Sequence, residues 1–192
     1  MKLRHSFALT LTPFFVLFLT PAVAVENIVI NYSYEEAAQT DLSNMRVTLK
    51  ISEFTDARNI DNPRLITDSD LAGVGTGFQA EKPIAAIISD ALTQGFVKAN
   101  ARLVDVDEDM SLQGSLLSTE AKIVDRQGVE SIQLTMRTKV ELKNGNRTIW
   151  QTTLFGRGTT PLSDGFNATV RAALDRTIRE LIIDDYFLLE IR

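Results

Sequence analysis

The chain has 192 residues, of which 20 are Lys or Arg and 25 are Asp or Glu, so its formal net charge is −5 at pH 7. An acidic chain lacks the basic surface that nucleic-acid phosphates and anionic lipids require, which argues against both partners. There is no cysteine, and the only histidine is His5. These absences exclude disulfides and thiolate chemistry, and they leave the chain after His5 without an imidazole general base or metal ligand.

The first residues have the pattern of a secretion signal. Lys2 and Arg4 precede an apolar run from Phe7 to Leu19, and small residues occupy the positions up to Ala24. The run is shorter than the roughly 20 residues of a membrane-spanning helix, so we predict cleavage after Ala24 rather than an anchor. Residues 25–192 would then be periplasmic, without a transmembrane segment, and their net charge would be −7 because Lys2 and Arg4 are removed.

The following stretch predicts short strands separated by turns. Apolar residues alternate with polar ones from Asn27 to Tyr34 and from Arg46 to Phe54, as in strands with one buried face. Leu65–Thr67 is predicted to be a further short strand. The polar segment Glu35–Asn44 predicts a connection, and the Asp- and Asn-rich segment Thr55–Arg64 predicts a surface loop.

A glycine-rich segment, Gly73–Gly77, comes next. Its spacing resembles a phosphate-binding loop only loosely, because no Lys-Ser or Lys-Thr pair follows. A tight turn that needs positive φ is the favoured interpretation.

The middle of the chain predicts a helix from Pro83 to about Asn100 and then a short strand over Leu103–Val106. The apolar residues of the helix recur at spacings of three and four, which places them on one stripe facing a sheet: Ile84, Ile87, Ile88, Ala91, Leu92 and Phe96.

An acidic run, Asp105–Asp109, raises the question of a calcium loop. A calcium loop of the helix-loop-helix type needs a glycine at its sixth position and a glutamate at its twelfth, whereas Met110 and Leu116 stand there. A solvated turn is the favoured interpretation, and weak divalent-cation binding is the alternative.

Three long alternating segments then predict a three-stranded meander. The first strand spans Leu112–Val124, the second presents alternate apolar residues from Ile132 to Leu142, and the third spans Arg147–Phe155. Turn signals separate them at Asp125–Gly128 and at Lys143–Asn146, where Asn-Gly is typical of a hairpin.

The outward face of the second strand carries polar side chains, among them Arg137 and Lys139. This pair could bind an anion, but a charged ladder that opposes edge aggregation is the favoured role.

A closing helix is predicted to begin after Pro161, with Ser163 as its cap, and to end near Tyr186. Its apolar stripe comprises Phe166, Val170, Ala173, Leu174, Ile178, Leu181 and Ile182. The tail Tyr186–Ile191 is too apolar for a free terminus, so we expect either an edge strand or a partner patch.

Together these elements predict one α+β domain over residues 25–192, with a mostly antiparallel sheet whose long three-stranded meander packs against two amphipathic helices. The strand end Glu53–Arg58, the helix start at Lys82-Pro83, the Leu112-Gln113-Gly114 strand and the closing helix over Ala168–Ile183 resemble the YajG-type lipoproteins of Gram-negative envelopes. The resemblance implies an envelope location and no catalytic residues. The family carries a cysteine for lipidation at the end of the signal, and this chain has none, so a soluble periplasmic form is expected.

The leading functional hypothesis is a non-catalytic periplasmic interaction or accessory module with an envelope protein partner and no cofactor. Its predicted partner-contact residues are Asp56, Arg58, Asn59 and Arg64; the Gly73–Gly77 turn and an unpaired sheet edge are further predicted contact surfaces.

Two alternatives stay open. The first is a small-ligand or lipid carrier with an apolar cleft between sheet and helices. The second is a hydrolase that uses Asp56, Asp105 and Asp107 as acid and base, although abundant carboxylates usually only keep a surface solvated.

Overall fold

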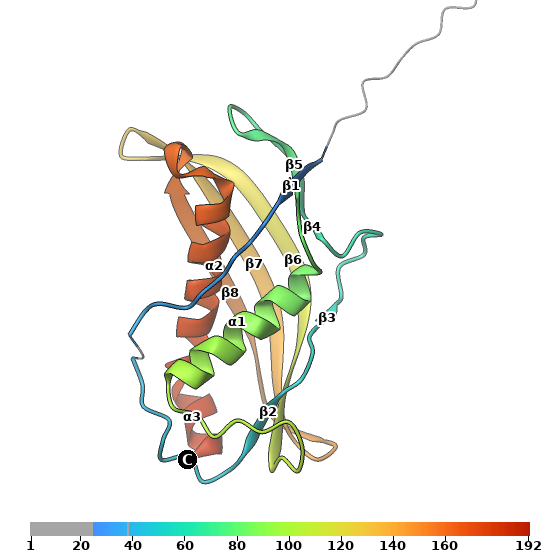
Figure 1. Ribbon diagram of the computed structural model, residues 1–192, viewed down its shortest axis with the longest axis vertical. Coiled ribbons are helices and arrows are strands. Elements are labelled where there is room, and N and C mark those ends of the chain that lie inside the picture. The colour runs from blue at the N-terminus through green and yellow to red at the C-terminus, as the bar shows by residue number, and fades with distance from the viewer. Residues whose placement is uncertain (1–24, 38) are drawn as a thin grey trace, which may run out of the picture.

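The computed structural model describes residues 25–37 and 39–192, so the predicted signal lies outside the described residues. The described chain forms two sheets and three α-helices (Figure 1). None of its helices is both long enough and apolar enough to span a bilayer.

The larger sheet is built on a long antiparallel meander. Its three strands are β6 (Met110–Arg126), β7 (Val129–Asn144) and β8 (Arg147–Pro161). Two short strands, β2 (Leu49–Ile51) and β3 (Thr55–Asp56), pair in parallel with β6. The spatial order is therefore β2-β6-β7-β8, with β3 also on β6, and β8 is an outer strand.

Both hairpins of the meander close with two-residue loops. In the first loop Gln127 and Gly128 have φ values of 56° and 83°, which is the requirement of a type I′ turn. In the second, Asn144 pairs with Arg147, so the loop is Gly145–Asn146 and only Gly145 has positive φ. The hairpin that Asn-Gly predicted is present, but its glycine stands at the first central position, as in a type II′ turn.

The smaller sheet lies beside β6 and has the order β1-β5-β4. Its strands are β1 (Glu26–Ile28), β4 (Leu65–Leu71) and β5 (Gly75–Ala80); β4 and β5 are antiparallel, and β1 is parallel to β5. Gly73 and Gly77 have φ values of 81° and 76°, so the glycine-rich segment is a turn that runs into a strand.

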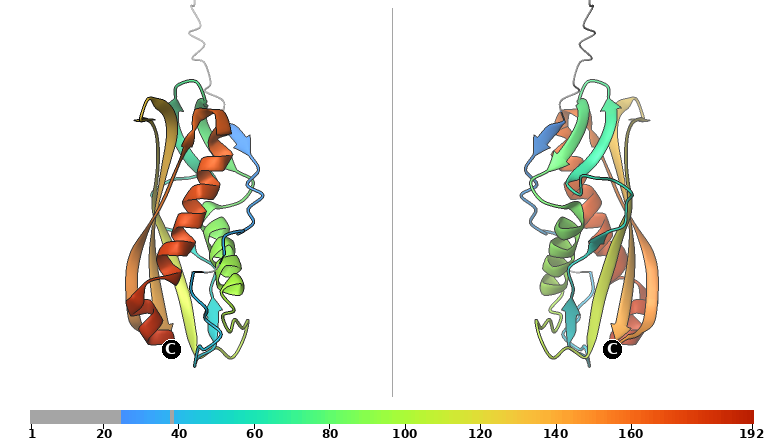
Figure 2. Two further views of the ribbon diagram at one scale, coloured as in Figure 1. Left: turned by 90° about the vertical axis from the view of Figure 1, so that its left-hand side faces the viewer. Right: turned by 90° about the vertical axis from the view of Figure 1, so that its right-hand side faces the viewer.

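The helices cover one face of the larger sheet (Figure 2). They are α1 (Ile84–Lys98), α2 (Gly165–Ile182) and α3 (Asp185–Ile191), and a short 3-10 helix, η1 (Leu162–Asp164), precedes α2. The predicted stripes of α1 and α2 are buried at every position. The other face of the meander carries no helix (Figure 2).

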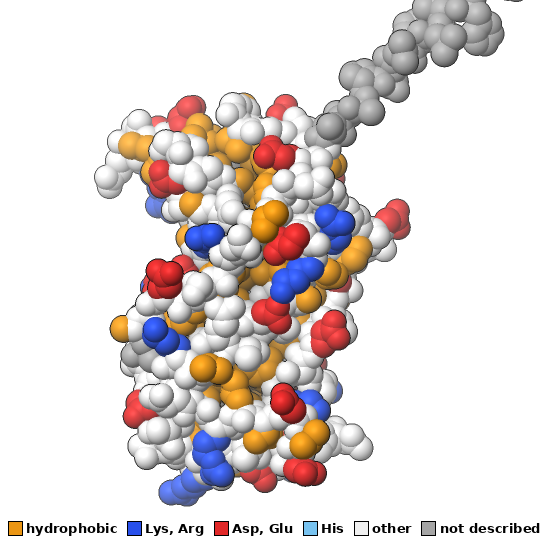
Figure 3. Space-filling view, viewed as in Figure 1, with side chains coloured by type: hydrophobic (Ala, Val, Ile, Leu, Met, Phe, Trp, Pro, Cys, Tyr) orange, Lys and Arg blue, Asp and Glu red, His pale blue; other side chains and the backbone are white. Residues whose placement is uncertain are grey.

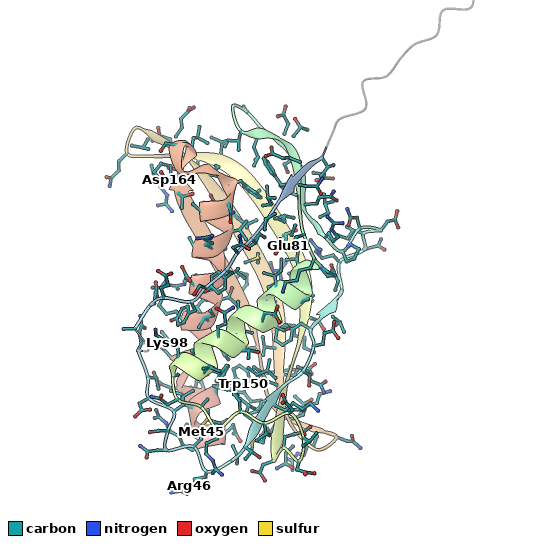
Figure 4. The ribbon with its side chains drawn as sticks, viewed as in Figure 1. Met45, Arg46, Glu81, Lys98, Trp150 and Asp164 are labelled. Atoms are coloured by element: carbon teal, nitrogen blue, oxygen red, sulfur yellow. The ribbon has the colours of Figure 1, made fainter. Side chains whose placement is uncertain are left out.

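One continuous core fills the space between the sheets and the helices. At its upper end Phe78 of β5 stacks on Phe166 of α2, with ring centroids 4.4 Å apart. At its lower end Phe187 of α3 contacts Phe96 and Trp150, with centroids 5.8 and 5.2 Å away; Trp150 is marked in Figure 4. Apolar burial on this scale is the main stabilising term of the fold.

Several predicted boundaries differ from the structure in the amino-terminal half. Of Asn27–Tyr34 only the first residues pair, in β1, whereas Ile30 and Tyr34 are buried without a strand partner. The segment Arg46–Phe54 contributes only β2, and β3 follows it. Leu65–Thr67 extends into the longer β4, while Leu103–Val106 forms a single bridge from Leu103 to Leu49.

The carboxyl-terminal prediction also needs correction. The closing helix ends at Ile182 rather than near Tyr186, and its cap is Asp164 rather than Ser163, without a side-chain capping bond. The tail forms a helix instead of an edge strand, and only some of its apolar side chains are exposed. Asp184 caps α3 by accepting a hydrogen bond from Phe187 N–H at 2.8 Å, and the helix buries Phe187, Leu188 and Ile191.

The fold class is otherwise confirmed, because the meander and the β4–β5 hairpin are antiparallel and only β1, β2 and β3 pair in parallel. The sheet is divided in two, and a third helix is added.

Candidate functional site

The outer face of the meander, which is the face without helices, is built from cross-strand rows of side chains that are polar except for Phe155. One row joins Ser118, Arg137 and Phe155 across β6, β7 and β8. The next joins Glu120, Thr135 and Arg157. A third joins Lys122, Gln133 and Thr159. Because the rows are fixed by the ladder of backbone hydrogen bonds, these side chains are displayed on a rigid platform.

A groove of about 580 Å³ crosses these rows. Its floor is the outer face of the meander, and its side wall is β4, which contributes Asp68 and Ser69. The full lining is Asp68, Ser69, Thr119, Glu120, Ala121, Lys122, Gln133, Thr135, Arg137, Phe155 and Arg157. The volume falls in the range of about 300–1,000 Å³ that is typical of small-molecule sites. We call this feature the outer groove.

The outer groove carries charges of both signs. Arg137 and Arg157 lie on β7 and β8, Asp68 lies on β4, and Glu120 and Lys122 both lie on β6. In the part of the chain that the structure describes, neither arginine has a carboxylate within 4.0 Å. Lys122 is likewise free of an ion pair there, so three cations of the groove stay available for an external anion.

An aromatic ring lies beside Arg137 in the groove. Phe155 is 45% exposed, although it is a large apolar residue. The guanidinium carbon of Arg137 lies 5.6 Å from the centre of its ring, within the range of a cation–π contact. The backbone N–H of Phe155 donates to Glu180 of α2 at 3.0 Å, so a helix side chain holds this part of the outer strand.

The helix-covered face differs from the groove. Figure 3 shows Lys and Arg side chains interspersed with Asp and Glu over α1 and α2, without a broad area of one sign. Of the predicted anion pair Arg137 and Lys139, the first lines the groove and the second pairs with Glu141 at 3.3 Å.

Two of the predicted partner-contact residues bind each other. Arg58 donates to both carboxylate oxygens of Asp56, with a shortest N–O distance of 2.6 Å. The same guanidinium donates to the carbonyls of Leu65 and Pro63 and to the hydroxyl of Thr119 at 2.9 Å. The Arg58 side chain is only 5% exposed, so its hydrogen bonds connect the loop to β6 inside the fold.

The other two predicted contact residues lie nearer the surface. Arg64 donates to the carbonyl of Ala80 at 2.8 Å and to the side chain of Asn27 at 3.2 Å. Asn59 is exposed and lines a smaller hollow of about 210 Å³, which shares Asp68 and Thr119 with the outer groove. The structure therefore brings the predicted loop to the rim of the groove, and its role as a contact stays a prediction.

The carboxylates of the hydrolase hypothesis are not assembled into a site. Asp56 lies opposite Leu116 of β6, whereas the acidic run enters the same strand at Met110. At about 3.3 Å per residue these points are roughly 20 Å apart. Asp109 accepts hydrogen bonds from the backbone and hydroxyl of Thr48, which lower its pKa. Among residues 25–37 and 39–192, no three acidic side chains gather as a metal site.

A second polar cluster holds the extended segment 29–36, which we call the strap, against the helices. Glu81, labelled in Figure 4, accepts from Ile30 N–H at 2.9 Å, and Gln94 accepts from Tyr34 N–H at 3.0 Å. The Tyr32 hydroxyl donates to Asp175 of α2 at 2.6 Å. Burial raises the pKa of Asp175 against the opposing effect of this hydrogen bond, and burial together with Asp175 raises the pKa of Tyr32.

Sequence patterns missed most of the outer groove for a specific reason. A β-bulge between Leu116 and Ser118 inserts one residue into β6 and reverses which residues face outward. Simple alternation from Leu112 would turn Glu120 and Lys122 toward the core, yet both face the groove. The alternation of β7 did place three residues of the groove lining on the outer face: Gln133, Thr135 and Arg137.

No protein-family model matches the chain, and no curated protein matches its sequence. Solved structures do match. Protein XCC0632 from Xanthomonas campestris, of family model DUF330, is 15% identical, and the match covers 82% of this chain and 92% of that one with a TM-score of 0.54. A putative neuraminyllactose-binding hemagglutinin homolog from Helicobacter pylori is 6% identical and covers 84% and 97%, with a TM-score of 0.43. The hypothetical protein CT253 from Chlamydia trachomatis is 10% identical and covers 75% and 94%, with a TM-score of 0.40. The first of these likenesses shows that the chain shares the fold of XCC0632.

Proposed function

We propose that this protein is a non-catalytic binding module of the bacterial envelope, and that its contact surface is the outer face of the meander. The observation that carries the proposal is the outer groove, a concave platform on three long strands that no helix covers. Its three cations have no carboxylate partner among the described residues, and its aromatic ring is exposed; both are groups that a binding surface uses.

The envelope location is supported by the sequence. A charged start, a short apolar run and small residues before Val25 are the features of an exported chain. The elements that resemble the YajG-type lipoproteins point to the same compartment, and the missing cysteine favours a form without a lipid.

The non-catalytic character is supported by the residue inventory. His5 belongs to the predicted signal, and there is no cysteine. The carboxylates considered for acid and base work lie apart, because Asp56 is on β3 opposite Leu116, whereas Asp105 and Asp107 precede the start of β6 at Met110. Asp56 is also held by Arg58. The groove has cations and hydroxyl groups but no histidine or cysteine that could act as nucleophile or base.

The carrier alternative with an apolar cleft between sheet and helices has less support. The side chains that face each other there are at most 1% exposed and fill the space: Leu49, Ile88, Leu92, Phe96, Leu112, Leu116, Leu134, Val140 and Ile178. A core packed in this way leaves no room for a lipid chain without rearrangement.

Photocrosslinking in living cells tests the proposal. A photoreactive p-benzoylphenylalanine replaces Thr153, which lies on the outer face of β8 beside Phe155, or Val97, which is 62% exposed on α1. The full chain is expressed so that export can occur. Discrete adducts from position 153, with few or none from position 97, are expected. Adducts from position 97 alone, or a protein retained in the cytoplasm, would contradict the proposal.

A further inference from the structure

We infer that the outer groove binds an acidic saccharide, with the acid group of the sugar on Arg137 and Arg157 and its hydroxyls toward Asp68 and Glu120. The inference rests on the proposed function, because it names the ligand class of the same surface. It follows from the arrangement of charge, aromatic surface and volume in the groove.

The anion subsite comes from the register of β7 and β8. Arg137 stands opposite Phe155, and Arg157 stands opposite Thr135, so the two arginines are diagonal neighbours on adjacent strands. Diagonal neighbours of one sheet face are close enough for long side chains to converge on one group. Guanidinium groups bind carboxylate and phosphate through paired hydrogen bonds, which a free anion in this position would receive.

The net charge of the chain makes this pair informative. A protein with a formal charge of −5 repels anions on average. Two arginines and Lys122 nevertheless share one concave surface, and in the described residues no carboxylate within 4.0 Å neutralises them. Local focusing in a groove can attract an anion that the whole molecule would not.

Two carboxylates of the groove supply acceptors. Asp68 and Glu120 lie on β4 and β6 without ion-pair partners in the part that the structure describes. A carboxylate accepts hydrogen bonds only, so it suits the hydroxyl donors of a sugar and disfavours a second acid group there. Thr135 and Gln133 on the floor can both donate and accept.

Phe155 completes the platform. Its ring is partly exposed beside Arg137 and belongs to the lining. The C–H face of a sugar ring is apolar and carries a partial positive charge, so it packs on the negative face of an aromatic ring. A groove of about 580 Å³ accommodates a short oligosaccharide rather than a single inorganic ion.

Titration calorimetry of the exported protein tests the inference with defined probes. Trigalacturonic acid represents a carboxylated saccharide and glucose 6-phosphate a phosphorylated one, while maltotriose, inorganic phosphate and phosphatidylglycerol vesicles serve as comparisons. Saturable binding of at least one acidic saccharide, and weaker or no binding of the three comparisons, is expected. Which of the two acidic probes binds more tightly identifies carboxylate or phosphate as the acid group.

Variants locate the site. Arg137→Gln and Arg157→Gln should each weaken binding about tenfold or more, because each removes a charged hydrogen-bonding partner. Phe155→Ala should also weaken saccharide binding, because it removes the ring on which the sugar packs. Arg147→Gln is the matched control, since Arg147 is exposed at the far end of β8 and does not line the groove. Thermal unfolding checks that every variant is folded.

Several outcomes would overturn the inference. These are the absence of saturable binding by both acidic saccharides, equal binding of maltotriose, equal binding of inorganic phosphate or phosphatidylglycerol vesicles, or an equal loss in Arg147→Gln. Adducts from position 153 with an envelope protein, without saccharide binding, would reject the ligand class and leave the proposed function standing.

Discussion

Arg58 and Arg157 are arginines at the same end of the molecule with different surroundings. The side chain of Arg58 is 5% exposed and binds Asp56, two carbonyls and Thr119, whereas Arg157 is exposed in the outer groove. The sequence showed Arg58 in a polar, turn-rich segment, which is typical of exposure. Its burial depends on Thr119, a residue distant in sequence, and such a contact cannot be inferred from local pattern.

We predict that substitution of Arg58 lowers the free energy of unfolding far more than substitution of Arg157. Arg58→Ala leaves Asp56 and the carbonyl of Leu65 without their partner, so the free energy of unfolding should fall by about 3 kcal/mol. Arg157→Ala should change it by less than about 0.5 kcal/mol. Urea unfolding measures both. A small effect of Arg58→Ala would mean that the loop is not held by this contact.

A second prediction concerns the Tyr32–Asp175 pair and pH. Burial raises the folded pKa of Asp175 above its ordinary value of 3.8, so the folded protein takes up the proton more readily than the unfolded chain. The stability from this group is full below pH 3.8 and is lost as pH rises through the folded pKa.

Asp175→Asn removes this titration. The free energy of unfolding of the unsubstituted protein minus that of the variant should therefore decrease as pH rises from 3.8 through the folded pKa of Asp175. Urea unfolding over that range measures the difference, and Asp61→Asn, at an exposed position, is the control. A difference that is constant or increases with pH would contradict the assignment.

At the scale of elements, β8 shows how a strand can be underestimated. The sequence pattern predicted its end at Phe155. Two glycines follow, and glycine usually weakens a strand. The strand continues to Pro161, since Gly156 and Gly158 face α2 and let the helix backbone approach. Gly156 and Gly158 therefore mark a close contact with α2, not the end of β8.

Gly158→Ala tests this packing. An added Cβ would lie 2.1 Å from the carbonyl oxygen of Thr169 on α2, so helix and strand must separate. Overpacking of this kind should lower the free energy of unfolding by about 1–3 kcal/mol, measured by thermal or urea unfolding. Thr159→Ala, at the adjacent position on the outer face, should have a much smaller effect. Equal effects would argue against a close contact of α2 with β8.

The carboxyl-terminal tail gives a further prediction at this scale. Phe187 is fully buried against Phe96 and Trp150, whereas Leu189 on the same short helix is 74% exposed. Phe187→Ala should cost about 3–5 kcal/mol of stability, and Leu189→Ala less than about 0.5 kcal/mol. If Leu189→Ala were the more damaging change, α3 would be docked through its other face.

At the scale of the whole molecule, hydrophobic period predicted the α+β class, the meander and the inner stripes of α1 and α2, because each depends on local alternation. The outer groove depends on the register of β6, β7 and β8, on the bulge before Ser118 and on β4 as a side wall. These features come from pairings between distant segments. The predicted loop Asp56–Arg64 nevertheless reaches the groove rim, since Arg58 binds the groove residue Thr119.

The measurement that tests the central claim most directly is quantitative crosslinking in cells from position 153, with Arg137→Gln and Arg157→Gln introduced together. If the outer face is the contact surface, the double substitution should strongly reduce the adducts, and Arg147→Gln should leave them unchanged. Adducts that persist in the folded double variant would show that the protein makes its contacts elsewhere.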